Sequence, residues 1–147
     1  MAKVRGHPFC RCLFYSASAL ARETTRLAEE AFAPSGLAPS VAYVLKSVLR
    51  EPGVGPGRNP EIMMLDASTV TRLLDRLERR KLARRRARGR RVAAWPPAEA
   101  KALGATLERC AEELNRRLGK ALGKDIQPLT AGVFDAALAV EARGGRS

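Results

Sequence analysis

Apolar and small side chains recur at alternating steps of four and three residues along the N-terminal part of the chain. The series is Leu13, Ala17, Leu20, Thr24, Leu27 and Ala31. This near-heptad spacing places one apolar stripe on an α-helix, so we predict a helix from Phe9 to about Phe32. Pro34 and Gly36 follow directly and predict the end of that helix.

Residues 37–50 show the same helical spacing, and residues 51–58 do not. Its apolar positions are Val41, Val44, Leu45, Val48 and Leu49. They predict a second helix over 37–50 that is buried on one side. Three glycines and two prolines between positions 51 and 58 predict a loop. Asn59, as an N-cap, and Pro60, at the first helical position, then predict a short third helix.

A two-sided helix is predicted after Asp66, which is a favourable N-cap residue. Its apolar positions, spaced i, i+3, i+4 and i+7, are Val70, Leu73, Leu74 and Leu77. The other face has short hydroxyls near its N-terminal end and mostly arginines further along. Its members are Ser68, Thr69, Thr71, Arg72, Asp75, Arg76 and Arg79. We therefore expect one face to join the core and the other to contact a polar partner.

The remainder of the chain predicts a small β-hairpin and two more helices. Segments 83–86 and 91–95 are the expected strands, and 87–90 is the turn, where Gly89 can adopt a positive φ. A long helix is expected from Pro97, with an apolar stripe through Leu103, Leu107, Cys110, Leu114 and Leu118. Residues 123–128 interrupt that stripe, and 129–142 predict the last helix.

Charge changes how this pattern is interpreted. The 147 residues have a formal charge of +12 and a pI near 10.8. Eleven basic and two acidic side chains lie between Arg72 and Arg91, so this segment supplies +9. Such an excess indicates a polyanionic partner, and a helix with a basic end followed by an Arg-rich hairpin is typical of winged-helix proteins on duplex DNA. The alternatives are a solvated cationic face and a protein that binds nucleic acid without sequence preference.

Other classes of function find little support in the sequence. A single histidine, with no nucleophile and base at a recognisable spacing, argues against an enzyme. The loop at 52–57 lacks the Lys-Ser/Thr of a phosphate-binding loop, and no cofactor is expected. No run of about 18 apolar residues could span a bilayer, and no signal-peptide core is present, so we expect a cytoplasmic protein without a membrane partner.

Two segments resemble the MarR family of winged-helix transcription regulators. Residues 65–79 are similar to the family's recognition helix, and 36–45 are similar to the helix that opens its DNA-binding domain. The resemblance implies a mainly α fold in which 37–95 form a winged helix-turn-helix domain with a β-hairpin wing. It further implies that helices in 8–33 and 97–142 form a homodimer. Members of the family usually repress transcription from a palindromic operator until a small ligand or oxidation releases them.

The resemblance also assigns the DNA contacts. They are Ser68, Thr69, Thr71, Arg72 and Arg76 from the helix, and Arg86, Arg88, Arg90 and Arg91 from the wing. The chain departs from the family at three places. The helix before Leu65 is about one turn shorter, Lys81 replaces the glycine expected after the recognition helix, and Gly89 replaces the wing aspartate. Lys81 must adopt a left-handed conformation, at a cost of about 1 kcal/mol, or the helix must end differently.

Cysteines near the N-terminus suggest a thiol-based variant of the same function. Some family members sense peroxide through a cysteine on the first helix, and Cys10 and Cys12 are the candidate redox residues here. The matching position is Arg11, about 100° around a helix from either cysteine. His7 with these cysteines would make three metal ligands without an evident fourth, so no metal site is expected. Cys110, on an apolar stripe, is expected in the core.

Overall fold

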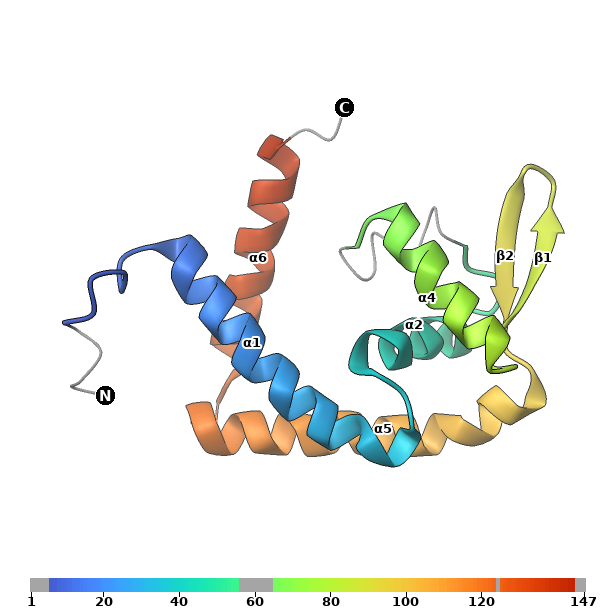
Figure 1. Cartoon of the computed structure of the whole chain (residues 1–147), viewed down its shortest axis with the longest axis horizontal. Coiled ribbons are helices and arrows are strands. Elements are labelled where there is room, and N and C mark those ends of the chain that lie inside the picture. Colours follow the sequence, from blue (N-terminus) through green and yellow to red (C-terminus); the bar gives the residue numbers. More distant parts are fainter. Residues whose placement is uncertain (1–5, 56–64, 124, 145–147) are drawn as a thin grey trace. The chain divides into compact units, whose positions relative to one another are not determined.

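The computed structural model describes residues 6–55, 65–123 and 125–144, and its elements are shown in Figure 1. In chain order they are α1 (Leu13–Phe32), the short 3-10 helix η1 (Ala33–Ser35), α2 (Pro39–Arg50), α4 (Ala67–Arg79), β1 (Arg84–Arg88), β2 (Arg91–Trp95), α5 (Ala98–Leu122) and α6 (Gln127–Gly144). The chain divides into two compact units, 1–114 and 115–147. A mainly helical fold with one hairpin is therefore confirmed. The short helix expected at Asn59 and Pro60 lies outside the described residues.

The first helix begins later than its apolar spacing predicted. Residues 7–12 form turns in which the backbone N–H of Cys12 donates to the carbonyl of Phe9, and α1 starts at Leu13. An aromatic cluster accompanies these turns, because the rings of His7 and Phe9 lie 5.2 and 5.3 Å from that of Tyr15. The predicted start at Phe9 was wrong, because Cys12 has an extended backbone and serves as the N-cap of α1.

Helices α2 and α4 form the centre of the first unit. The largest fully buried side chains come from α1, α2, α4 and α5, and they are Phe32, Val44, Leu45, Val48, Val70, Leu74, Leu77 and Leu107. Each lies at an apolar position of the predicted stripes or, for Phe32, at the end of the first helix. The guanidinium of Arg80 adds a polar link, since it donates to the carbonyl of Gly36 in the turn before α2. This packing fixes the position of α4 while its other face stays outside the core.

The end of α4 settles the question raised by Lys81. This residue has a φ of +58°, in the left-handed region. The backbone N–H of Lys81 donates to the carbonyl of Glu78, and that of Leu82 donates to the carbonyl of Leu77. These two bonds form a Schellman motif, which satisfies carbonyls at the end of the helix. A lysine therefore occupies a conformation in which glycine would be unstrained.

The hairpin is longer in its strands and tighter in its turn than expected. Strand β1 continues to Arg88, which pairs with Arg91 across a two-residue turn in place of the predicted four-residue turn. Gly89 has a φ of +64°, the conformation that such a short turn requires at its first position. Gly89 therefore permits the tight turn, and the strands keep an unbroken register.

A short segment of the predicted loop lies against the hairpin. Val54 forms an isolated antiparallel bridge with Ala94, and the backbone N–H of Gly53 donates to the Ala94 carbonyl. A Cβ on Gly55 would lie 2.2 Å from the carbonyl oxygen of Val92. The glycines predicted a loop correctly, but at Gly55 the absence of a side chain is what allows the backbone to approach β2.

The second unit contains the end of α5 and helix α6. The latter begins at Gln127, two residues before its predicted start, with Pro128 in its first turn, where proline is tolerated. No residue of α6 is buried in the structure as described. Across the described ranges, no helix is both long enough and apolar enough to cross a membrane.

Candidate nucleic-acid interface

The N-terminal end of α4 is organised around the carboxylate of Asp66. This carboxylate accepts hydrogen bonds from the Thr69 backbone N–H (2.8 Å), the Ser68 hydroxyl (2.6 Å) and the Thr69 hydroxyl (3.0 Å). The Thr69 hydroxyl in turn accepts a hydrogen bond of 3.1 Å from the guanidinium of Arg72. Three of the predicted DNA contacts are thus brought together, in a network that preorganises the first turn of the helix.

Further along α4 the predicted DNA contacts differ in how exposed they are. The Thr71 hydroxyl donates to the carbonyl of Ala67, one turn earlier, and its side chain is half-buried. Arg76 is exposed and lines a hollow of about 490 Å³ together with Arg79 and Arg80. The apolar wall of this hollow consists of Leu37, Ala38 and Val41. Arg72, Arg76 and Arg79 therefore give the exposed face of α4 a positive charge along most of its length.

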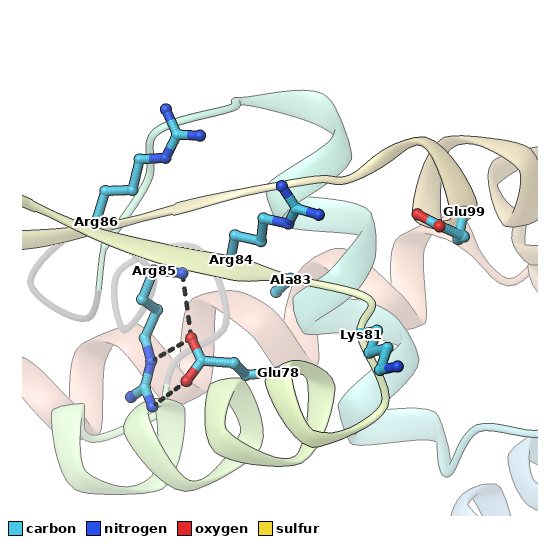
Figure 2. A pocket seen from close by; sticks show the side chains of 7 residues that line it. All are labelled: Glu78, Lys81, Ala83, Arg84, Arg85, Arg86 and Glu99. Carbon is cyan, nitrogen blue, oxygen red and sulfur yellow. Dashed lines mark hydrogen bonds and ion pairs between the residues drawn. The ribbon is translucent and has the colours of Figure 1, made fainter.

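An ion-pair cluster joins α4 to the wing. The guanidinium of Arg85, on β1, lies 2.5 Å from a carboxylate oxygen of Asp75 and 3.0 Å from one of Glu78. The backbone N–H of Arg85 also donates to Glu78, at 3.1 Å. Figure 2 shows this contact at a hollow of about 400 Å³ below the wing, with Arg85 turned toward α4. We call these three residues the wing clamp.

The wing clamp shifts the pKa values of Glu78 and Arg85. Hydrogen bonds from Arg85 lower the pKa of the Glu78 carboxyl, in spite of a smaller opposing effect of desolvation. The same hydrogen bond with Glu78 raises the pKa of the Arg85 guanidinium, and Asp75 adds to this effect. Both shifts favour the charged forms of Glu78 and Arg85. The clamp uses both acidic side chains of segment 72–91 to hold the hairpin beside the helix.

The other wing arginines are exposed and have no carboxylate within ion-pair distance in the described parts of the chain. They are Arg84, Arg86, Arg88, Arg90 and Arg91. Arg88, Arg90 and Arg91 surround the tight turn at the tip, as predicted. Arg86 lies in the middle of β1, before the tip, and Figure 2 shows it on the side of β1 opposite Arg85. The predicted wing contacts therefore occupy two places on the hairpin.

The cysteines occupy different environments. Cys10 and Cys12 are exposed in the turns before α1, and Cys110 is buried on α5, as its apolar stripe predicted. No disulfide links them. Within the described residues, no three His, Cys, Asp or Glu side chains gather as a metal site would require. The redox role of Cys10 and Cys12 stays a prediction.

Comparison with solved structures identifies this arrangement. A MarR variant from E. coli in complex with operator DNA superposes with a TM-score of 0.75 at 18% identity, covering 89% of this chain and 99% of that one. MepR from S. aureus, also in a DNA complex, gives a TM-score of 0.73 at 16% identity, with 88% and 98% covered. The chain has the MarR fold. No family sequence model and no curated protein sequence matches it.

A third neighbour adds a ligand-bound example of the MarR fold. CouR from Rhodococcus jostii, solved with p-coumaroyl-CoA, gives a TM-score of 0.70 at 19% identity and covers 84% of this chain and 89% of its own. At such low identity the shared property is the winged-helix fold itself, in which β1–β2 is the wing hairpin.

Two arginines of the wing were given no individual role by the sequence analysis. Arg85 was counted only as part of the general positive charge, whereas it holds the wing to α4. Arg84 was likewise not assigned, although it is exposed on the same strand as Arg86. The signal was available, because alternate residues of a strand point to opposite faces, so Arg84 and Arg86 must differ from Arg85.

Proposed function

We propose that this protein is a sequence-specific, DNA-binding transcription regulator and not an enzyme. The observation that supports this most directly is the wing clamp, which holds an arginine-bearing hairpin beside a helix whose exposed face is basic. Both elements are attached to one core, so they can contact one DNA duplex at the same time. A cytoplasmic protein with double-stranded DNA as its partner fits this proposal.

The chemistry of each surface matches one groove of DNA. The width of the major groove admits an α-helix, and an arginine such as Arg72 or Arg76 can donate two hydrogen bonds to O6 and N7 of guanine. The hydroxyls of Ser68, Thr69 and Thr71 can rotate from their internal partners to phosphate oxygens beside the helix N-terminus. Arginines at the wing tip suit the negative potential of a narrow minor groove.

We further propose that the protein acts as a homodimer on a palindromic operator. Large apolar side chains of α6 are exposed in the single chain, which is what a subunit interface leaves when the partner is absent. They are Leu129, Val133, Phe134, Leu138 and Val140. A twofold dimer would present two copies of α4 to two half-sites, whose spacing would follow that of the helices.

Repression relieved by a small ligand completes the proposal. CouR, which shares this fold, was solved with p-coumaroyl-CoA, and the MarR variant and MepR were solved with DNA. By analogy we propose that a ligand shifts the dimer toward a spacing of the two α4 helices that no longer matches the operator. Such a ligand acts only through its preference for one of the two states.

A gel-shift experiment with DNA from upstream of the protein's own gene tests the proposal. We expect a complex that resists an excess of random duplex. Replacing Thr69, Thr71 and Arg72 together by alanine should abolish this preference and leave weak, salt-sensitive binding. Thr106→Ala, on α5, is the matched control and should leave the preference unchanged.

The same experiment distinguishes the main alternative. A protein that binds nucleic acid without sequence preference would lose affinity steeply with salt and would not discriminate between duplexes at any salt concentration. Equal competition by operator and random DNA, together with equal binding by the triple variant and the wild type, would overturn the regulator proposal in favour of that alternative.

A further inference from the structure

We propose that Asp66 and Thr69 are positioning residues, which hold the guanidinium of Arg72 in the orientation that reads a guanine. The resemblance to the MarR family counted Thr69 among the DNA contacts, and Asp66 was expected only as the cap of the helix. In this proposal both residues act on DNA through Arg72. Their role rests on the proposed function and deepens it, because it names the group that is read and the side chains that make the reading selective.

The hydrogen bonds at the start of α4 have a single consistent direction. A carboxylate has no proton to donate, so the Thr69 hydroxyl gives its one proton to Oδ2 of Asp66, at 3.0 Å. The lone pairs of the same hydroxyl oxygen are left to accept, and they accept from Nη2 of Arg72 at 3.1 Å. Asp66 therefore orients the Thr69 hydroxyl so that it favours a donor such as a guanidinium.

Helix geometry supports this chain of hydrogen bonds. Side chains of an α-helix lean toward its N-terminus, so the side chain of Arg72 passes over Thr69, three residues earlier. Thr69 is half-buried, and its backbone N–H donates to Oδ1 of Asp66 at 2.8 Å. Its neighbour Val70 is fully buried in the core. Thr69 is thus a rigid support for an arginine that is itself exposed.

Arg72 keeps the donors that a guanine requires. A guanidinium has five N–H groups in one plane, and the bond to Thr69 uses one of them. The others still include two parallel donors, which match O6 and N7 of guanine in the major groove. No carboxylate of the described residues lies within ion-pair distance of Arg72, in contrast to Arg85 in the wing clamp. Thr69 therefore orients the guanidinium and leaves it available to DNA.

An arginine that is ordered before binding reads a base more selectively than a mobile one. A mobile side chain loses its rotamer freedom when it binds guanine, and this cost reduces the preference for guanine. A mobile guanidinium can also turn to a phosphate oxygen, which contains no sequence information. We therefore expect loss of the Thr69 hydroxyl to reduce the preference for guanine more than the affinity for DNA in general.

Base analogues test this role on duplexes that contain the sequence selected by the protein. Each guanine of a half-site is replaced in turn by 7-deazaguanine, which lacks the N7 acceptor, or by inosine, which keeps O6 and N7. The wild type should lose affinity on the order of tenfold at one guanine with the first analogue and little with the second. At that position Arg72→Ala should bind guanine and 7-deazaguanine equally. Discrimination by Arg72→Ala equal to that of the wild type at every guanine would overturn the proposal.

Variants of Thr69 then separate positioning from contact. Thr69→Val removes the hydroxyl at nearly constant volume and should lower the preference for guanine over 7-deazaguanine on the order of fivefold. Thr69→Ser keeps the hydroxyl and should keep the preference. Equal weakening of both duplexes by Thr69→Val would make Thr69 a direct phosphate contact, and the positioning role would be wrong.

Ser68→Ala is the matched control for the loss of a hydroxyl. The Ser68 hydroxyl also donates to Asp66, at 2.6 Å, but no hydrogen bond joins it to Arg72 in the described structure. The control should therefore leave the preference for guanine unchanged. A loss as large as that caused by Thr69→Val would contradict a specific role of Thr69.

Asp66→Asn reverses the direction of the hydrogen bonds and keeps the helix cap. Asparagine is as favourable as aspartate at the N-cap, so α4 should stay folded. With its carbonyl oxygen on the Thr69 backbone N–H, the new amide donates to the Thr69 hydroxyl, which turns its own proton toward Arg72. The preference for guanine should fall as in Thr69→Val, whereas the affinity for random duplex should rise because a negative charge is removed. An unchanged preference would contradict the role of Asp66.

The free protein provides a readout that does not involve DNA. The Nε–H signal of Arg72, identified by its absence in Arg72→Lys, should have a higher NMR order parameter in the wild type than in Thr69→Val. Equal order in both would overturn the positioning role and leave the proposed function intact. A wild type that prefers no sequence would overturn the proposed function, and the reading of guanine with it.

Discussion

Helices α4 and α6 use apolar residues in opposite ways. Helix α4 buries Val70, Leu73, Leu74 and Leu77 within its own chain and exposes arginines. Helix α6 has apolar side chains of similar size but buries none of its residues in the described structure, where Phe134 is 48% and Val140 is 66% exposed. The first helix buries its apolar face inside its own unit, whereas the second leaves its large apolar side chains exposed.

The difference separates two tasks of the chain. A recognition helix must be held rigidly by its own core, because its exposed face is used for DNA. A dimerisation helix can leave its apolar face to be buried at assembly, where the same hydrophobic gain per area applies. A second copy of the chain is the partner that this account proposes for α6, and changes in the two helices should therefore have different consequences.

The largest effect is expected from a charge placed on α6. Phe134→Asp should raise the dimer dissociation constant on the order of a hundredfold, about 2.7 kcal/mol, because a carboxylate would be buried at the interface. Sedimentation equilibrium measures this constant. Thr130→Asp adds the same charge without removing a large apolar side chain and should have a smaller effect. A wild-type chain that is monomeric at every concentration would disprove the role assigned to α6.

A smaller effect, of a different kind, is expected from truncating a leucine of α4. Leu74→Ala should lower the free energy of unfolding by about 2–5 kcal/mol, because it leaves a cavity in the core. That loss should not depend on protein concentration, whereas the loss caused by Leu138→Ala on α6 should. Urea unfolding at two protein concentrations compares them. The distinction between the helices fails if both losses respond equally to dilution.

The left-handed residue at the end of α4 allows a stabilising change. Lys81→Gly should raise the free energy of unfolding by about 0.5–1 kcal/mol, because glycine adopts a φ of +58° without strain. Lys81→Ala removes the same charge and keeps the strain, so it is the control. Thermal unfolding of each variant measures its stability. Equal stability of the glycine and alanine variants would show that the strain at this position is negligible.

The wing clamp should give the smallest effect, visible through pH. The pKa of Glu78 is lowered in the folded protein, so its ion pair stabilises the fold above the unfolded pKa of about 4.3 and loses that contribution as pH falls through the folded value. Glu78→Gln should flatten the pH dependence of stability in that range, and DNA affinity at neutral pH should fall slightly as the wing loosens. An unchanged dependence of stability on pH would show that the wing clamp does not stabilise the fold.

Some of this structure could be predicted from spacing alone. The buried face of α4, its N-cap Asp66 and the hairpin with Gly89 all follow from local rules that need no tertiary partner. The start of α1 could not, because the apolar spacing does not reveal the turns of residues 7–12 that precede it. The sequence also left open whether Lys81 would adopt the left-handed conformation or the helix would end differently.

The sequence predicted which segment is basic, but not that its arginines make different contacts. Charge density identified segment 72–91, yet it counted Arg85 only as part of the general positive charge. Arg85 differs from its neighbours only because Asp75 and Glu78 lie one helix turn apart beside that strand, which requires knowledge of how the hairpin packs. Net charge could not reveal these ion pairs, because it counts charged residues and does not say which of them are in contact.

We propose above that the exposed face of α4 reads DNA sequence. The most direct test is competition between the duplex selected from a random pool and a random duplex of equal length, at physiological salt. The account predicts a preference of at least about a thousandfold for the selected duplex, which substitution of Arg72 and Thr71 by alanine reduces to near unity. A ratio near one for the wild type would contradict the claim.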